Sequence, residues 1–302
     1  KGFIMKKINA WSLGATMYVP AMHKDLSFIL AGTKEISSAL AQPRSLVICL
    51  EDAVREEDLE EALERLELGL KYAKKTEQLH FVRPRNVEIL KKVMSMKNID
   101  VIDGFVLPKI THENIQDYLD VLPESHNFML MPTLETAEVF EISHMKRLRD
   151  ILLPVQDKIL ALRVGGNDLL NCLGMRRPKS GTIYDTPVGL AIHNLVQIFK
   201  PAGFDLTAPV FEIIDRMELL EEEVKKDLMC GLVCKTAIHP SQIHIIEKHY
   251  EVNNQDIEMA EAILDKDAPA VFRMHGTMCE PATHRKWAEQ ILIRLNVYGN
   301  LK

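Results

Sequence analysis

The chain has 302 residues, a formal net charge of −6, 47% hydrophobic residues and 26% charged residues. These values are typical of a soluble globular protein with a sizeable core, arranged as one large domain or two ordinary ones. The acidic balance and the lack of a basic run argue against nucleic acid or a membrane surface as a partner. No apolar run approaches the roughly 18 residues of a membrane span, and no signal peptide is visible.

The cysteines indicate a reducing compartment. The sequence has five cysteines, an odd and low count, and Cys49, Cys230 and Cys234 lie in apolar runs. Buried free thiols are common in such runs, whereas secreted proteins of this kind pair their cysteines. We therefore expect a cytoplasmic protein.

Short apolar runs of strand length alternate with amphipathic segments along most of the chain. We expect strands at residues 17–21, 45–50, 79–82, 104–109, 128–132, 159–164, 205–211 and 232–238. We expect helices from Asp25 to about Leu40 and over residues 59–73, 86–96, 112–122, 136–150, 188–199 and 215–229, with a short helical turn at 169–174. Residues 176–186 form the longest irregular stretch, a polar and basic loop.

This alternation predicts parallel βα units, because continuous rather than alternating hydrophobicity is typical of strands buried on both faces. Eight units in about 240 residues fit a (β/α)8 TIM barrel, which we place at residues 5–250. A doubly wound sheet is the competing fold, although no Gly-x-Gly-x-x-Gly follows the first strand. Residues 251–302 predict a C-terminal helical extension of two helices around a linker at 268–281. This extension is a candidate to pack across a subunit boundary.

Ionisable residues follow seven of the eight predicted strands. In a TIM barrel the carboxyl ends of the strands form one face, where active sites lie. The residues at these ends are Glu51, Asp52, Arg83, Lys109, Glu135, Asp168, Glu212 and His239. Each has an ordinary structural explanation when it is taken alone.

Glu135 and Glu138 could be acids favoured by a helix N-terminus, and Asp168 could be an N-cap. Lys109 could be a surface lysine, and His239 could belong to a capped helix start. Together these explanations are weaker, because the barrel brings all of the residues to one mouth.

The acids on neighbouring strands indicate a divalent metal. Glu135 and Asp168 follow adjacent strands, so their carboxylates can converge on one ion, and Mg²⁺ prefers one or two carboxylates plus water and substrate oxygens. Zinc would require His or Cys ligands, and no cluster of His or Cys occurs at these strand ends. Gly165 and Gly166 would let a ligand approach the backbone closely. Arg83 is suited to a carboxylate or to an oxygen that develops negative charge.

Eight short segments, in order across nearly the whole chain, resemble the citrate lyase β-subunit-like group of the HpcH/HpaI aldolase/citrate lyase family. They are residues 18–20 (YVP), 50–54 (LEDAV), 82–83 (VR), 106–109 (VLPK), 134–137 (LETA), 166–169 (GNDL), 235–242 (KTAIHPSQ) and 271–278 (VFRMHGTM). The resemblance implies a TIM-barrel carbon–carbon lyase.

The resemblance also implies roles for single residues. Glu135 and Asp168 match the magnesium ligands of the family, and Arg83 matches the arginine at the substrate carbonyl. Glu51 and Asp52 match an acidic pair that lines the pocket. Members of the family commonly act on acyl-CoA thioesters such as citryl-, malyl- or citramalyl-CoA. They commonly assemble as trimers or hexamers, so a homo-oligomer is expected.

The sequence departs from the family pattern at several positions. Gly14 replaces the usual arginine near the first strand, Ala21 replaces a glycine, Asn167 replaces a glutamate and Cys49 replaces an aspartate. Residues 208–211 (APVF) replace the usual Asp-Thr-Val-Tyr. These departures keep both metal ligands and leave open whether the substrate carries CoA. The pattern resembles a divergent branch of TIM-barrel carbon–carbon bond lyases.

The resulting hypothesis is Mg²⁺-dependent retro-aldol or retro-Claisen cleavage of a hydroxy acid, or the reverse condensation. Glu51 or Asp52 would move the proton, Arg83 would stabilise the oxyanion, and Lys109, Gly165 and Gly166 would contact substrate. Three alternatives remain. They are a CoA-free aldolase of hydroxy-oxo acids, a thioesterase or synthase on the same site, and a non-catalytic subunit that binds a metabolite.

Overall fold

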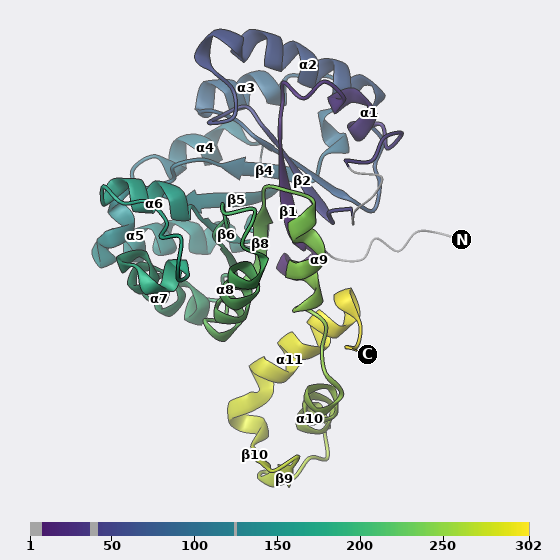
Figure 1. Cartoon of the computed structure of the whole chain (residues 1–302), viewed down its shortest axis with the longest axis vertical. Helices are drawn as coiled ribbons and strands as arrows, with labels where there is room; N and C mark the ends of the chain where they lie inside the picture. The colour runs from purple at the N-terminus through teal and green to yellow at the C-terminus, as the bar shows by residue number, and fades with distance from the viewer. Residues whose placement is uncertain (1–7, 37–41, 124–125, 302) are drawn as a thin grey trace. The chain divides into compact units, whose positions relative to one another are not determined.

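The computed structural model describes residues 8–36, 42–123 and 126–301. Within them, eight parallel strands close into a barrel in chain order, and β8 pairs with β1. Figure 1 shows the strands at the centre of a ring of helices. The strands are β1 (Ala15–Pro20), β2 (Ser45–Cys49), β3 (Leu79–Arg83), β4 (Gly104–Leu107), β5 (Met129–Leu134), β6 (Leu162–Val164), β7 (Leu206–Ala208) and β8 (Val233–Ala237). The predicted (β/α)8 barrel is confirmed, and the doubly wound alternative is wrong.

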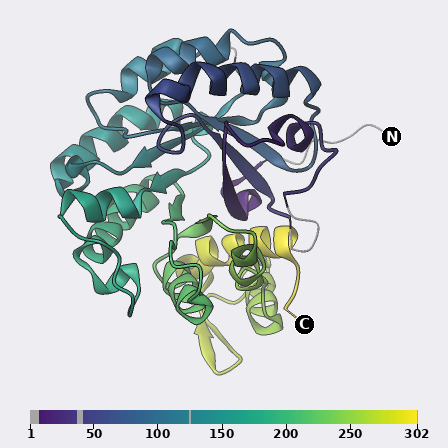
Figure 2. The ribbon, with the colours of Figure 1, turned by 45° about the horizontal axis from the view of Figure 1, so that its top comes forward.

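Helices follow the strands around the barrel, as the second view also shows (Figure 2). The helices are α1 (Leu26–Leu30), α2 (Leu59–Tyr72), α3 (Val87–Met94), α4 (Ile115–Val121), α5 (Ile142–Leu152), α6 (Gly166–Cys172), α7 (Pro187–Phe199), α8 (Met217–Met229) and α9 (Ser241–Lys248). Short 3-10 turns are η1 (Ala10–Leu13), η2 (Glu56–Asp58), η3 (Ile99–Val101), η4 (Ala137–Phe140), η5 (Leu153–Lys158), η6 (Ile183–Asp185) and η7 (Lys200–Ala202).

The main core lies between the strands and the helices that cover them. Every residue of β2, β3 and β4 is buried, as expected for strands covered on both faces. The apolar stripe of α2 is buried at Leu59, Ala62, Leu63, Leu66 and Leu70, the positions that the helical period predicts. This packing fixes the strand ends from which the candidate site residues project.

Helix α1 is shorter than the sequence predicts. It ends at Leu30, where Gly32 adopts a left-handed conformation (φ 68°) and Thr33 N donates to Phe28 O at 3.0 Å. A glycine in this conformation is a common helix terminator. The predicted continuation to Leu40 is wrong up to residue 36, and residues 37–41 lie outside the described residues.

The chain separates into two compact units, one ending at Ile243 and one beginning at His244. The second unit contains α10 (Asn254–Leu264), α11 (Pro281–Tyr298) and the antiparallel pair β9 (Phe272–Met274) and β10 (Thr277–Cys279). A small apolar cluster holds it together, with Val252, Ala260, Ile263, Cys279, Ala288 and Ile291 buried. The two predicted helices are present, and the expected linker forms a hairpin. The assignment of catalysis to residues 5–250 stays a prediction.

The state of the cysteines and the length of the helices are relevant to the predicted cytoplasmic location of the protein. Cys49, Cys234 and Cys279 are buried, Cys230 is half-buried and Cys172 is exposed, and all five are free thiols. In the described part of the chain, no helix is long and apolar enough to cross a lipid bilayer. The cytoplasmic location stays a prediction.

Candidate active site

Arg83 lies at the centre of the charged residues at the barrel mouth. It is the last residue of β3 and only 8% of its surface is exposed. Its Nη2 lies 2.8 Å from Glu135 Oε1 and 3.0 Å from Glu51 Oε2, with Asp52 Oδ2 at 3.6 Å. One guanidinium thus joins acids that follow two different strands, β2 and β5.

Lys109 contributes both its backbone and its side chain. It follows β4 in a left-handed conformation (φ 50°), which points its N–H to Glu135 Oε1 at 2.8 Å. Asn114 Nδ2 donates to Lys109 O at 2.9 Å and holds this turn. The ammonium group pairs with Glu51 and lies 3.2 Å from Asp52 Oδ1. Lys109 is therefore part of the cluster and not a solitary surface lysine.

Glu51 and Asp52 have different environments although they are adjacent. Burial, together with its hydrogen-bonding contact with Asp52, raises the pKa of the Glu51 carboxyl. Burial would also raise the pKa of Asp52, but its interaction with Glu51 and the charges of Arg83 and Lys109 hold that pKa below its usual value. Two neighbouring carboxyls with separated pKa values are a common arrangement for an acid and a base.

Glu135 and Asp168 influence each other electrostatically. Burial raises the pKa of Glu135 to about 7; the positive charge of Arg83 opposes this rise, and the negative charge of Asp168 adds to it. The pKa of Asp168 is also raised, by burial and by the charge of Asp52. The structure therefore brings Asp168, which follows β6, into the same group of charges as Glu135. Raised carboxyl pKa values at neighbouring strand ends are what a bound cation would relieve.

Gly165 and Gly166 make room for protein atoms. A Cβ at Gly165 would lie 2.3 Å from Glu135 Cβ and 2.5 Å from Glu135 Oε2. A Cβ at Gly166 would lie 2.6 Å from Ile183 Cδ1 and 2.8 Å from Pro209 Cβ. The absence of a side chain at Gly165 leaves space for Glu135, and its absence at Gly166 lets the start of α6 pack against Ile183 and Pro209. The predicted contact of these glycines with a ligand stays a prediction.

The remaining residues at the strand ends lie in other surroundings. Asp168 is in the first turn of α6, whose N-cap is Gly165, so the N-cap explanation for Asp168 is wrong. His239 Nδ1 lies 2.7 Å from Ser241 Oγ and accepts the Ser241 N–H at 3.2 Å, and Ser241 is the first residue of α9 and not its N-cap. Glu212 lies 3.7 Å from Arg176 Nε.

A cavity of about 550 Å³ lies beside the start of α6. It is lined by Asn167, Leu170, Asn171, Met175, Arg176, Arg177 and Glu212. Asn167, Leu170 and Asn171 share one face of α6, and Asp168 is not among the residues that line the cavity. Its size is in the range of pockets for small organic ligands.

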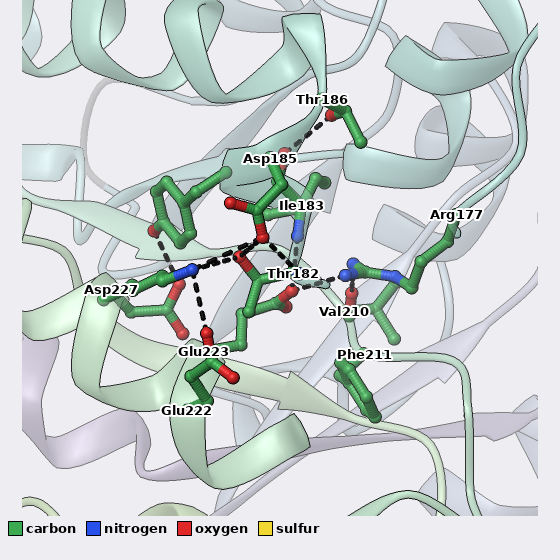
Figure 3. A network of polar contacts seen from close by, with 12 residues as sticks. Arg177, Thr182, Ile183, Asp185, Thr186, Val210, Phe211, Glu222, Glu223 and Asp227 are labelled. Atoms are coloured by element: carbon green, nitrogen blue, oxygen red, sulfur yellow. Dashed lines mark hydrogen bonds and ion pairs between the residues drawn. The ribbon is translucent and has the colours of Figure 1, made fainter. Parts of the chain in front are cut away.

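A buried ionic network holds the loop that borders this cavity, and Figure 3 shows the part of it around Arg177, Glu223 and Asp227. Lys235 Nζ, from β8, lies 2.9 Å from Glu223 Oε1 and 2.8 Å from Asp227 Oδ2, both on α8. Glu223 also pairs with Arg177 and accepts the N–H of Ile183 at 2.8 Å. These bonds fix both ends of the 177–183 stretch, and Ile183 in turn packs against Gly166.

The sequence interpretation missed this network. It treated residues 215–229 as a charged helix, yet Glu223 and Asp227 are only 0% and 2% exposed. The one signal was Lys235, a charged residue inside an apolar strand. A buried lysine requires an acidic partner, and the period of α8 places residues 223 and 227 on one face.

The chain matches the family described as "C-C_Bond_Lyase of the TIM-Barrel fold" over residues 7–300. The match covers nearly the whole chain, so the protein belongs to this family of carbon–carbon bond lyases. No curated protein matches the chain.

Solved structures share the fold at low sequence identity. CitE from Mycobacterium tuberculosis, in complex with magnesium, acetoacetate and coenzyme A, is 20% identical, with a TM-score of 0.68 over 94% of this chain and 98% of that chain. The citrate lyase beta subunit from M. tuberculosis with oxaloacetate and magnesium is 20% identical, with a TM-score of 0.59 over 79% and 97% of the two chains. RipC from Yersinia pestis is 18% identical, with a TM-score of 0.58 over 79% and 94%.

Proposed function

We propose that this lyase depends on Mg²⁺ and cleaves, or forms by the reverse condensation, a hydroxy acid carried as an acyl-CoA thioester of the citryl, malyl or citramalyl type. The main support is the arrangement around Glu135, where Arg83 and the Lys109 N–H bind one carboxylate oxygen and Asp168 adds a second carboxylate. Similar structures are complexes with magnesium, acetoacetate and coenzyme A, or with magnesium and oxaloacetate. Glu135 and Asp168 are the proposed metal ligands.

The donor set fits magnesium. Glu135 and Asp168 offer hard oxygens, and Mg²⁺ commonly uses one or two carboxylates and completes its octahedron with water and substrate. Among the described residues, no group of three or more His, Cys, Asp or Glu is placed to hold a metal, so the candidate consists of these two carboxylates. When it is bound, the ion supplies Lewis-acid stabilisation of the substrate oxygens.

Arg83 is the proposed stabiliser of the developing oxyanion. Its Nη2 is engaged by Glu51 and Glu135, while its buried Nε has no hydrogen-bond partner among the described residues. A fixed guanidinium inside a closed barrel needs no reorganisation when charge develops on the substrate. Retro-aldol and retro-Claisen cleavage both place negative charge on a carbonyl-derived oxygen.

Glu51 is the proposed proton carrier, with Asp52 and Lys109 as its partners. Burial raises its pKa, so it can hold a proton at a pH where an exposed glutamate cannot. The ammonium of Lys109 bonds to Glu51 and would stabilise the carboxylate after proton transfer. Lys109 would also bind the carboxylate or acyl oxygen of the substrate at the mouth.

A CoA-free aldolase remains the second candidate. Gly14 and residues 208–211 depart from the family pattern at positions that accompany CoA-dependent members. Product analysis by mass spectrometry distinguishes the reactions. A lyase releases two carbon fragments from a thioester, a thioesterase releases CoA and the intact acid, and a CoA-free aldolase condenses pyruvate with small aldehydes. The absence of all three reactions would support a metabolite-binding subunit.

The metal assignment is tested by titrating Mg²⁺ into the wild type, Asp168→Asn and the matched control Glu138→Gln. Glu138 lies three residues from Glu135, in the first turn of η4. We expect Asp168→Asn to weaken binding at least about tenfold, because it removes one of two charged ligands. Equal binding by all three proteins would refute the metal site. Light scattering of the wild type tests the predicted trimer or hexamer.

A further inference from the structure

A buried arginine lies inside the barrel without an acidic partner. Arg163, on β6, is only 2% exposed. Its Nη2 donates to Thr236 Oγ1, its Nη1 lies 3.8 Å from Met131 Sδ, and its Cζ lies 5.4 Å from the centre of the Tyr18 ring. Among the described residues, no carboxylate forms an ion pair with it. A cation buried without a counter-charge is strongly unfavourable, so its presence requires an explanation.

Two unsatisfied hydroxyl groups flank this arginine. Arg163 is the register partner of Thr133 on β5 and of Thr207 on β7. Arg163 reaches Tyr18 on β1 and Thr236 on β8, which are not its neighbours in the sheet, so its side chain points into the barrel. Partners in register point to the same side of a sheet, and Thr133 and Thr207 therefore point inward too. Their buried Oγ1 atoms have no hydrogen-bond partner among the described residues.

This layer lies directly beneath the candidate active site. Glu135 follows the last residue of β5 and lies two residues after Thr133, which corresponds to about 7 Å of extended chain. The half-buried Tyr18 lies within electrostatic range of Arg163, Arg83 and Glu135. Glu51 and Glu135 balance the charge of Arg83, while that of Arg163 stays unbalanced. The floor of the site therefore combines an uncompensated positive charge with free hydroxyl groups.

We propose that Arg163, Thr133 and Thr207 bind a second carboxylate of the substrate. The rise of about 7 Å along the chain from Thr133 to Glu135 is comparable to the length of an extended four-carbon diacid. The preferred substrate is then a hydroxy acid with two free carboxylates, either a free dicarboxylate or a citryl-type thioester, and not a monocarboxylic acid. This assignment rests on the proposed function, because it assumes that the first carboxylate binds near Glu135 and Asp168.

The test compares two stable acids that differ by one carboxylate. Binding of L-malate and L-lactate to the Mg²⁺-saturated protein is measured by calorimetry for the wild type, Arg163→Met and Arg163→Lys. We expect the wild type to prefer malate at least about tenfold, since a charge-assisted bond is added. Arg163→Met should lose that preference and bind lactate within about twofold of the wild type, and Arg163→Lys should keep part of it.

A second variant tests the proposal in case Arg163→Met does not fold. The double substitution Thr133→Val with Thr207→Val keeps the side-chain volume at both positions and leaves Arg163 in place. It should weaken malate binding several-fold without changing lactate binding. An unchanged malate-to-lactate ratio in Arg163→Met, or no malate preference in the wild type, would overturn the proposal. Mg²⁺-dependent lactate binding without a malate preference refutes only this subsite. Failure of both acids to bind in a Mg²⁺-dependent way refutes the proposed function and the subsite together.

Discussion

Arg83 Nη2 donates a 2.8 Å hydrogen bond to Glu135 Oε1 across the mouth of the barrel, from β3 to the end of β5. The bond fixes one oxygen of the buried carboxylate. The other oxygen, Oε2, faces Gly165 at the end of β6, the strand that leads to Asp168. Arg83 thus orients a proposed metal ligand, besides offering charge to the substrate.

Arg83→Lys should slow cleavage strongly. Lysine keeps a positive charge but loses the rigid guanidinium whose Nη2 bonds two acids and whose Nε stays open, and loss of one fixed oxyanion donor typically costs about 10²–10³-fold in kcat. We expect Mg²⁺ affinity to change less than about threefold, because Glu135 and Asp168 remain and the Lys109 N–H still holds Glu135 Oε1 at 2.8 Å. Steady-state kinetics measures the effect on kcat, with the thioester that the product analysis identifies as substrate. Mg²⁺ titration measures the effect on metal affinity.

Arg149→Lys is the matched control for this substitution. Arg149 donates to Asp150 Oδ1 on α5, outside the cluster, so its change should leave kcat nearly unaltered. An Arg83→Lys enzyme with wild-type kcat would show that Arg83 has no role at the reacting oxygen.

Gly165→Ala should displace Glu135. The new methyl group would lie 2.3 Å from Glu135 Cβ, a separation that forces the side chain or the strand to move. Overpacking of this kind costs about 1–3 kcal/mol of unfolding free energy. Mg²⁺ affinity should fall at least about tenfold, because the carboxylate leaves its position.

Gly69→Ala provides the comparison. Gly69 lies in α2, and its added methyl group would meet the flexible end of the Leu30 side chain. Gly69 is far along the chain from the cluster. Urea unfolding and Mg²⁺ titration of both variants measure the two effects. Equal Mg²⁺ affinity for Gly165→Ala and the wild type would contradict the proposed role of Glu135.

The barrel could be predicted from the sequence because its signal is local and repeated. Each strand is a short apolar run and each covering helix has a 3.6-residue stripe, so the order of elements determines the topology. The gathering of Glu51, Arg83, Lys109 and Glu135 followed from that topology alone, since strand ends share one face. The left-handed turn at Lys109 did not, because lysine has no preference for it.

The buried polar groups could not be predicted in the same way. Whether Glu223 faces solvent or Lys235 depends on how α8 lies against β8, a relation between elements that no local pattern encodes. Arg163 has the same difficulty, because a charged residue in an apolar run gives no information on which side of the strand it points to. Register and helix packing decide both cases.

Lys235→Met should destabilise the protein strongly. The substitution leaves Asp227 and Glu223 buried with less positive charge, and breaking a buried ion pair from one side typically costs about 3–5 kcal/mol. The control is Lys225→Met, which breaks the exposed pair with Glu221 at 2.8 Å and should cost about 0.5 kcal/mol or less. Urea unfolding at pH 7 compares the two. Equal losses would show that the buried ion pairs of Lys235 with Glu223 and Asp227 contribute no more than a surface pair.

Asp227 should make stability depend on pH. Burial raises its pKa to about 6 from an ordinary 3.8; the positive charge of Lys235 opposes this rise, and the negative charge of Glu223 adds to it. An acid whose folded-state pKa exceeds its unfolded value binds its proton more tightly when folded. Its contribution is therefore fully present below pH 3.8 and is lost as the pH rises through 6. The shift corresponds to at most about 3 kcal/mol.

Asp227→Asn removes this proton while it keeps the shape of the side chain. The unfolding free energies of wild type and variant, measured in urea from pH 4 to pH 8, give a difference in which other titrating groups largely cancel. The unfolding free energy of the wild type minus that of the variant should decrease between pH 4 and pH 6 and level off above pH 7. If the difference instead grows with pH, Asp227 is ionised throughout this range and its bond to Lys235 outweighs its burial.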